Sequence, residues 1–227
     1  LTFLKDEQNH EAFQALLAAK DSLIPFVGAG FSSAHCPSWS GFLTLLHGKI
    51  EAQMTTADKA TYTRLNKTKP IDYEAILNLL FTCAGKGVGN RLVKETFNLD
   101  LPDDASFKSK LALFHRAFSG PWITTNLDRF IEASYGGAYT SVNGNDTDRL
   151  HALLTQEDNK GLLLKIHGDA KEPKTWVLSQ SEYEQAYNSE QGADLSAALP
   201  QFLERLFSNY TLLFIGCSLG DDRPLQL

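Results

Sequence analysis

Several features that would assign this chain of 227 residues to a specialised class are scarce or missing. Its three cysteines, Cys36, Cys83 and Cys217, are too few and too far apart for a disulfide framework or a CxxC metal or redox motif. No apolar run approaches the ~18 residues that a membrane helix needs, and residues 1–10 lack the basic-then-apolar pattern of a signal peptide. We therefore expect a soluble, cytoplasmic protein that binds no metal and no membrane.

Positive charge is also in deficit, since 21 Lys and Arg face 27 Asp and Glu and give a formal net charge of −6. This balance disfavours a broad nucleic-acid footprint, although it is compatible with a local basic groove, and we expect no direct nucleic-acid binding by this domain. Hydrophobic residues make up 43% of the chain, which is enough for a substantial core. The length predicts one large domain over residues 1–227. Because the chain starts at Leu and stops soon after an apolar run, we expect a fragment of a longer, multidomain protein.

Short apolar runs alternate with helical patterns along most of the chain. Strands are predicted at 23–27, 122–125, 139–142, 162–166 and 211–215, with a further short one at 176–178. Helices are predicted at about 9–20, 42–50, 127–135, 194–207 and from Ser181, through a capping box with Glu184, to residue 187. Residues 51–118 contain helical stretches and no convincing strand. The pattern predicts an α/β fold in which helices cover both faces of a parallel sheet, with an all-helical insertion at about 51–118.

Four of the predicted strands end in polar or glycine-rich groups. These groups are residues 28–32, Thr125-Asn126, His167-Gly168 and residues 216–218. In open parallel sheets, ligands bind outside the carboxyl ends of the strands. The sequence therefore predicts a ligand site where these four strand ends converge.

Each motif also has an ordinary interpretation when it is taken alone. Residues 28–30, Gly-Ala-Gly, supply the first two glycines of a dinucleotide-binding turn but not the third. A simple turn is therefore an equally good interpretation of these residues. Asn126 could cap the helix that follows it, with Asp128 in the first turn of that helix. An isolated His167 could be a buried histidine with satisfied hydrogen bonds. The small residues at 217–218 could merely suit a crowded strand end.

The order of the motifs is more specific than any one of them. The order is GAGFS at 28–32, PSW at 37–39, TTNLD at 124–128, KIHGD at 165–169 and GCSLGDD at 216–222. It resembles the sirtuin-type NAD-binding fold, and more closely the sirtuin-like NADase domains of bacterial anti-phage defence proteins. The resemblance implies a Rossmann-like sheet whose helical insertion covers the cofactor site. Deacylases of that family carry a zinc module with two CxxC pairs and a TQNID sequence; this chain has neither, which puts peptide deacylation in doubt.

The resemblance also assigns roles to matching residues. It places catalysis at the nicotinamide ribose with Asn126 and His167. Contacts with NAD would come from Gly28, Ala29, Gly30, Phe31, Ser32, Trp39, Thr125, Asp128, Gly168, Gly216, Cys217 and Ser218. The implied activity is hydrolysis of NAD, as substrate and without a metal, to nicotinamide and ADP-ribose.

The biological setting that the resemblance implies is an NAD-depleting effector in anti-phage defence. A sensor domain or partner protein would supply the trigger, and we expect an oligomer. Two alternatives stay open: a module that senses NAD or ADP-ribose without turning it over, and an ADP-ribosyltransferase or deacylase.

Overall fold

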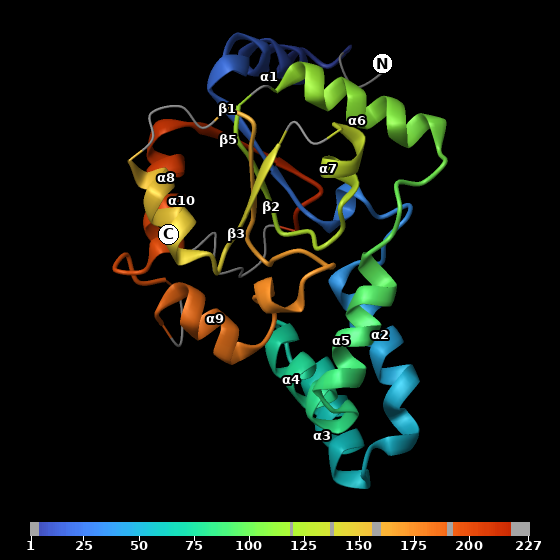
Figure 1. Ribbon diagram of the computed structural model, residues 1–227. Coiled ribbons are helices and arrows are strands. Elements are labelled where there is room, and N and C mark those ends of the chain that lie inside the picture. The colour runs from blue at the N-terminus through green and yellow to red at the C-terminus, as the bar shows by residue number, and fades with distance from the viewer. Residues whose placement is uncertain (1–4, 119, 137–138, 156–159, 190–192, 219–227) are drawn as a thin grey trace.

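The computed structural model describes residues 5–118, 120–136, 139–155, 160–189 and 193–218. Within these ranges, helices flank a five-stranded sheet whose order is β3-β4-β2-β1-β5 (Figure 1). The strands are β1 (Leu23–Val27), β2 (Trp122–Thr124), β3 (Thr140–Asn143), β4 (Leu162–Lys165) and β5 (Thr211–Ile215). All their pairings are parallel. The prediction of an α/β fold with a Rossmann-like parallel sheet is confirmed.

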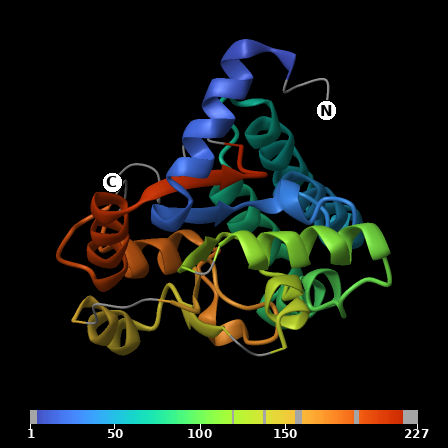
Figure 2. The same ribbon diagram turned by 90° about the horizontal axis from the view of Figure 1, so that it is seen from above.

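The three central strands, β1, β2 and β4, are buried on both faces, which explains why they read as nearly continuous apolar runs. Successive side chains of a strand point to opposite faces. Leu23, Trp122 and Leu163 accordingly belong to one hydrophobic cluster, and their neighbours Ile24 and Ile123 belong to another. The helices that pack in the second cluster are α8 (Thr147–Leu154), α9 (Gln180–Tyr187) and α10 (Ala198–Asn209). In the two views of Figures 1 and 2, α8 and α10 lie on one side of the sheet and α6 on the other.

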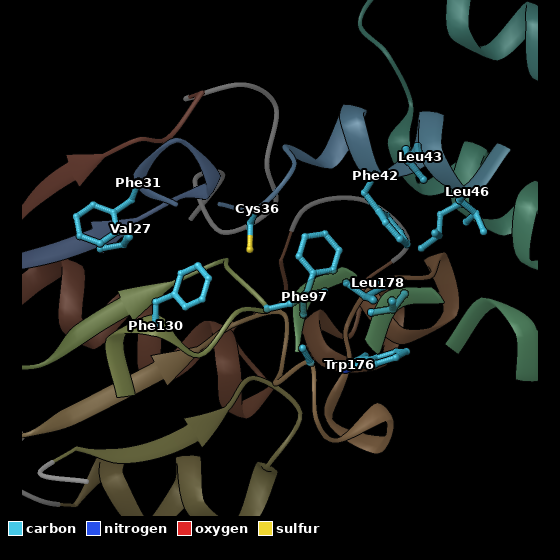
Figure 3. Close-up of a cluster of buried hydrophobic side chains, with 14 of the residues drawn as sticks. Val27, Phe31, Cys36, Phe42, Leu43, Leu46, Phe97, Phe130, Trp176 and Leu178 are labelled. Carbon is cyan, nitrogen blue, oxygen red and sulfur yellow. The ribbon is translucent and has the colours of Figure 1, made fainter. Parts of the chain in front are cut away.

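The first cluster reaches from the sheet into helices that lie between β1 and β2 and into the helix that follows β2. It contains side chains of α2 (Trp39–Ile50), α4 (Tyr73–Ala84), α5 (Lys86–Phe97), α6 (Ala105–Ala117) and α7 (Phe130–Ser134). Figure 3 shows it running from Val27 and Phe130, near the sheet, to Phe42 and Leu46 on α2. The two other helices, α1 (Glu7–Ala18) and α3 (Thr56–Lys67), bury no residue fully. The helices of the first cluster are thus joined to the sheet by a continuous apolar core.

Residues 51–118 contain helices and no strand, as the sequence predicts. Figure 1 shows α2 to α5 as a lobe beside the end of the sheet where β1 leads into α2. Local sequence fixes several helix starts: the Ser38 hydroxyl accepts a hydrogen bond from the Gly41 amide at α2, and Asp104 accepts one from the Phe107 amide at α6. These caps fix where α2 and α6 begin.

Two local predictions are wrong. Residues 176–178 form no strand; they are buried in the core, and the Val177 amide donates to the His167 carbonyl in the loop after β4. An apolar run is equally explained by burial beneath a loop, and periodicity does not separate the two cases. The capping box of α9 is formed by Ser179 and Glu182, not by Ser181 and Glu184, because the helix begins two residues earlier than predicted.

Candidate functional site

The carboxyl ends of four strands lie at one level of the sheet. Val27 pairs with Thr124 on one side and with Ile215 on the other, and Thr124 pairs with Lys165. Because all these strands are parallel, the residues that follow them emerge at the same edge. The structure therefore brings the four predicted motifs together at this edge.

The glycine turn after β1 packs directly on the turn after β5. The Gly28 amide donates to the Ile215 carbonyl and the Gly30 amide to the Gly216 carbonyl, each over 2.9 Å. A Cβ atom on Gly28 would lie 2.7 Å from the Gly216 oxygen, and one on Gly30 would lie 2.9 Å from the Gly216 Cα. Gly216 itself has φ +69°, a left-handed conformation that favours glycine. The three glycines are thus required by contact between the two turns. The sequence left a dinucleotide-binding turn and a simple turn open at residues 28–30, and it did not predict this contact.

Gly30→Ala is expected to lower the free energy of unfolding by about 1–3 kcal/mol, because the new methyl group meets the backbone of residue 216. Gly48→Ala is the matched control, since a Cβ there has nothing within 4 Å and alanine favours the helix. Urea unfolding of both variants measures the difference. A Gly30→Ala protein as stable as the parent would show that the two turns are not held in this contact.

The loop after β2 is tied to β1 and to the glycine turn. The Thr124 hydroxyl donates to the Val27 carbonyl over 2.9 Å and accepts from the Asn126 amide over 3.0 Å, and the Thr125 amide also donates to Val27. The Asn126 side chain is 8% exposed, and its Nδ2 donates to the Ser32 hydroxyl over 3.3 Å. Its Oδ1 is buried and accepts no hydrogen bond from the described residues. One end of this buried amide is therefore open to a donor that the described protein does not supply.

The interpretation of Asn126 as a helix cap is wrong. The α7 helix begins at Phe130, and its N-cap position is Arg129, whose side chain makes no cap hydrogen bond. Asp128 instead accepts a hydrogen bond from the Phe130 amide over 3.1 Å. The loop leaves β2 irregularly for five residues, so the helix starts three residues later than the sequence predicts. Asn126 therefore does not cap α7, and its side chain contacts Ser32 instead.

Burial raises the pKa of two acidic groups at this loop. Burial raises the pKa of the Asp128 carboxyl, against the opposing effects of the Phe130 amide and the Lys165 charge. Burial, together with Asp128, raises the pKa of the Cys36 thiol to about 12. Since the thiolate is the reactive form of cysteine, Cys36 is an unreactive thiol at neutral pH. The site therefore has no cysteine nucleophile at this position.

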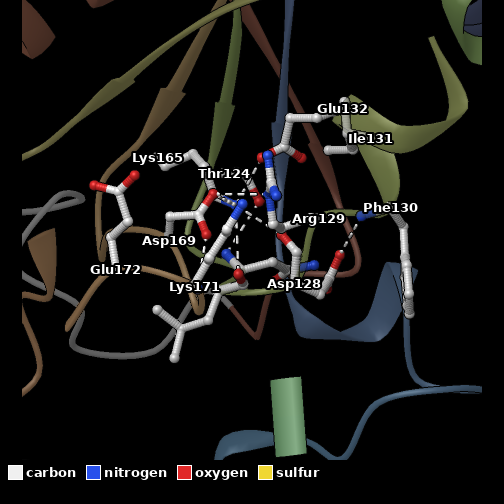
Figure 4. A network of polar contacts seen from close by, with 12 residues as sticks. Thr124, Asp128, Arg129, Phe130, Ile131, Glu132, Lys165, Asp169, Lys171 and Glu172 are labelled. Atoms are coloured by element: carbon white, nitrogen blue, oxygen red, sulfur yellow. Dashed lines mark hydrogen bonds and ion pairs between the residues drawn. The ribbon is translucent and has the colours of Figure 1, made fainter. Parts of the chain in front are cut away.

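A buried lysine joins the loops after β2 and β4 (Figure 4). The side chain of Lys165, the last residue of β4, is 0% exposed. Its Nζ donates to the Asp128 carbonyl over 2.7 Å, to the Leu127 carbonyl over 3.3 Å and to Glu132 Oε1 over 2.8 Å. The Asp169 carboxylate lies 3.4 Å away. One ammonium group thus holds the loop of Asn126 against α7 and against the loop of His167.

Arg129 makes a second link between the same loops, because its Nε lies 3.1 Å from the Asp169 carboxylate. Sequence reasoning gave no role to Lys165 or Arg129. The signal for Lys165 was a charged residue inside the apolar run at 162–166, because a lysine is almost never buried without a partner.

His167 lies two residues beyond the end of β4 and is half-buried. Its Nε2 lies 2.9 Å from the hydroxyl of Tyr183 on α9, and the two rings meet edge to face with centroids 5.5 Å apart. Gly168 has φ +89°, and a Cβ there would collide with the Thr175 carbonyl. Glycine at 168 is therefore required by the turn, which positions the histidine ring at the edge of the sheet.

The remaining predicted residues contribute differently. The Phe31 side chain is buried against Phe114 of α6, and the Phe31 carbonyl accepts a hydrogen bond from Lys110. Trp39 is half-buried and packs on the Phe42 ring at the start of α2. The Cys217 thiol donates to the Phe26 carbonyl over 3.3 Å, and Ser218 is exposed. The Phe31 amide donates to the Gly28 carbonyl within the glycine turn, so Phe31 serves the core and the turn.

Neither a metal site nor a membrane-spanning helix is found among the described residues. Among those residues, no three His, Cys, Asp or Glu side chains are placed to hold a metal ion. The same part of the chain has no helix that is both long and apolar enough to span a membrane.

A cavity of about 340 Å³ lies beside the edge, between the start of α5, the loop after β3 and α9, and none of the predicted site residues lines it.

Comparison with known protein families finds a similarity over part of the chain. Residues 122–227 match the SIR2-like domain family. The matched region begins at β2 and contains Asn126, His167 and the turn after β5, whereas the glycine turn after β1 lies outside it. No curated protein sequence matches the chain. The SIR2-like match indicates an NAD-related activity.

Proposed function

We propose that this protein is an NAD glycohydrolase, which cleaves NAD to nicotinamide and ADP-ribose. The observation that carries the proposal is the buried Asn126 amide, whose Oδ1 accepts no hydrogen bond from the described residues. A buried acceptor without a partner costs about 1–3 kcal/mol, so its retention at a ligand-binding edge is explained by a bound hydroxyl or water. The SIR2-like match at residues 122–227 supports NAD as the ligand that brings this donor.

The reaction breaks the bond between the nicotinamide nitrogen and C1 of the ribose. The bonding electron pair leaves with nicotinamide, which departs as a neutral molecule, and the ribose passes through an oxocarbenium-like transition state. A water molecule then forms the new C–O bond and loses a proton. No strong general acid is needed, so the protein must mainly hold the ribose and place one water molecule.

The two polar side chains suit these tasks. An amide both donates and accepts hydrogen bonds, so Asn126 can orient the ribose hydroxyl or the attacking water through Oδ1. An imidazole exchanges a proton near neutral pH, so His167 can accept the proton that the water or a ribose hydroxyl loses. In this proposal the pyrophosphate lies against the turn at residues 28–32. The amides of Gly28, Gly30, Phe31 and Ser32 already donate to protein carbonyls, so among the amides of this turn the proposal assigns the pyrophosphate contact to that of Ala29.

The biological part of the proposal follows the resemblance to NADases of anti-phage defence. The helical lobe of α2 to α5 would cover the bound NAD. A sensor domain or a partner protein would release the activity, in a cytoplasmic oligomer that depletes NAD. The domain itself would contact neither nucleic acid nor membrane.

The products of NAD distinguish the proposal from its alternatives. The whole protein is incubated with NAD in its triggered assembly, and nicotinamide and free ADP-ribose are quantified by chromatography. Hydrolysis gives the two in equal amounts. Nicotinamide in excess of free ADP-ribose would instead show an ADP-ribosyltransferase or deacylase. Saturable NAD binding without release of nicotinamide would show a sensing module and would refute the proposed activity.

A further inference from the structure

The hydroxyl of Tyr183 is built into a fixed position beside His167. Tyr183 is 7% exposed and occupies the first turn of α9, whose start is fixed by Glu182 accepting from the Ser179 amide over 2.9 Å. Its ring stacks on that of Tyr187, one turn further along the helix, with centroids 6.0 Å apart. Since helix start and ring are both held by the protein, the 2.9 Å contact with His167 Nε2 is set by the fold.

We propose that Tyr183 is a positioning residue for His167, an inference that rests on the proposed function. The loop after β4 leaves the imidazole half-buried, so its ring orientation is not fixed by core packing alone. A hydrogen bond at one ring nitrogen fixes the orientation and tautomer of the other. When the phenol oxygen accepts from Nε2–H, Nδ1 of the neutral imidazole stays unprotonated and can accept a proton, and the same hydrogen bond persists in the imidazolium. Tyr183 therefore holds the ring through both protonation states that proton transfer requires.

Tyr183→Phe removes the hydroxyl and keeps the ring that packs on Tyr187 and His167. Tyr187→Phe is the matched control: it removes a phenol hydroxyl from the same helix, and its fully buried ring stacks on Tyr183. Both variants are expected to fold, because each keeps the aromatic volume at its position.

The first readout is independent of NAD. Side-chain ¹⁵N–¹H correlation spectra report the tautomer of each histidine, and His167→Gln identifies the His167 signals. Tyr183→Phe should shift the Nε2 resonance of His167, and Tyr187→Phe should leave it in place. An unchanged resonance in Tyr183→Phe would overturn the proposal.

The second readout is the kinetics of nicotinamide release. Tyr183→Phe should lower kcat roughly 2- to 12-fold, the value of one hydrogen bond, with KM for NAD unchanged. Tyr187→Phe should keep both at the parent values. A parent that releases nicotinamide and a Tyr183→Phe variant with the same kcat would overturn the positioning role alone. A parent that releases none would overturn the proposed function and, with it, this role.

Discussion

Replacing Lys165 by methionine is expected to lower the free energy of unfolding by about 3–5 kcal/mol, the range for removing one partner of a buried ion pair. Methionine has nearly the same length, so the loss reflects charge and hydrogen bonds more than volume. The variant leaves the carboxylates of Glu132 and Asp169, which are 12% and 13% exposed, without their buried cation. The carbonyls of Leu127 and Asp128 lose their donor as well. Urea unfolding measures the change.

Lys108→Met is the matched control for this experiment. The Lys108 ammonium lies 2.8 Å from Asp103, the same distance as between Lys165 and Glu132, but the pair is exposed. Exposed ion pairs contribute little because water screens them, so this variant should unfold almost as the parent does. Equal unfolding curves for the two variants would contradict the assignment of Lys165 as the cation that joins the loops.

His167→Ala is expected to slow NAD hydrolysis by roughly 10²–10⁴, the usual contribution of general acid–base assistance. ADP-ribose binding should survive, since the predicted pyrophosphate contact lies at the turn of residues 28–32. The change in melting temperature should be small, because the histidine is half-buried and its loss removes one hydrogen bond to Tyr183. Nicotinamide release and thermal melting on the same preparation provide the two measurements.

His115→Ala is the matched control, because it removes a histidine that is buried in the core. His115 is 7% exposed, and its ring nitrogens lie 2.7 Å from the Ser134 hydroxyl and 3.2 Å from the Tyr139 hydroxyl. Burial lowers the pKa of this imidazole. Its removal should reduce melting temperature and leave turnover per folded molecule unchanged. A His167→Ala protein that folds normally and hydrolyses NAD at the parent rate would remove His167 from the mechanism.

The sheet was predictable because burial on both faces leaves a direct trace in the sequence. Runs such as residues 23–27 and 162–164 are apolar and buried throughout, and each lies in a strand of the parallel sheet. The same reasoning failed at 176–178, where an apolar run is buried beneath a loop instead of paired in the sheet. An apolar segment predicts burial, but it does not predict whether the segment pairs with a neighbouring strand.

The predicted motifs meet at one edge because parallel strands share a direction, which follows from the fold class. What each residue does there depends on contacts that are distant in sequence. Asn126 donates to Ser32, 94 positions away, and that contact together with the late start of α7 overturns the capping interpretation. Tyr183 carried no motif at all, and its contact with His167 depends on where α9 lies. The spacing of residues along the chain does not predict contacts of this kind.

The most direct test of the account compares nicotinamide release by the parent protein and by Asn126→Ala, in the same triggered assembly and at equal concentrations of folded protein. Asn126 caps no helix, so the variant should melt close to the parent temperature. If Oδ1 orients the water or the ribose, release should fall roughly 10²–10³-fold, as for loss of one aligned hydrogen-bonding group. The account predicts a normally folded variant that has almost stopped releasing nicotinamide, and a folded variant that releases it at the parent rate would contradict it.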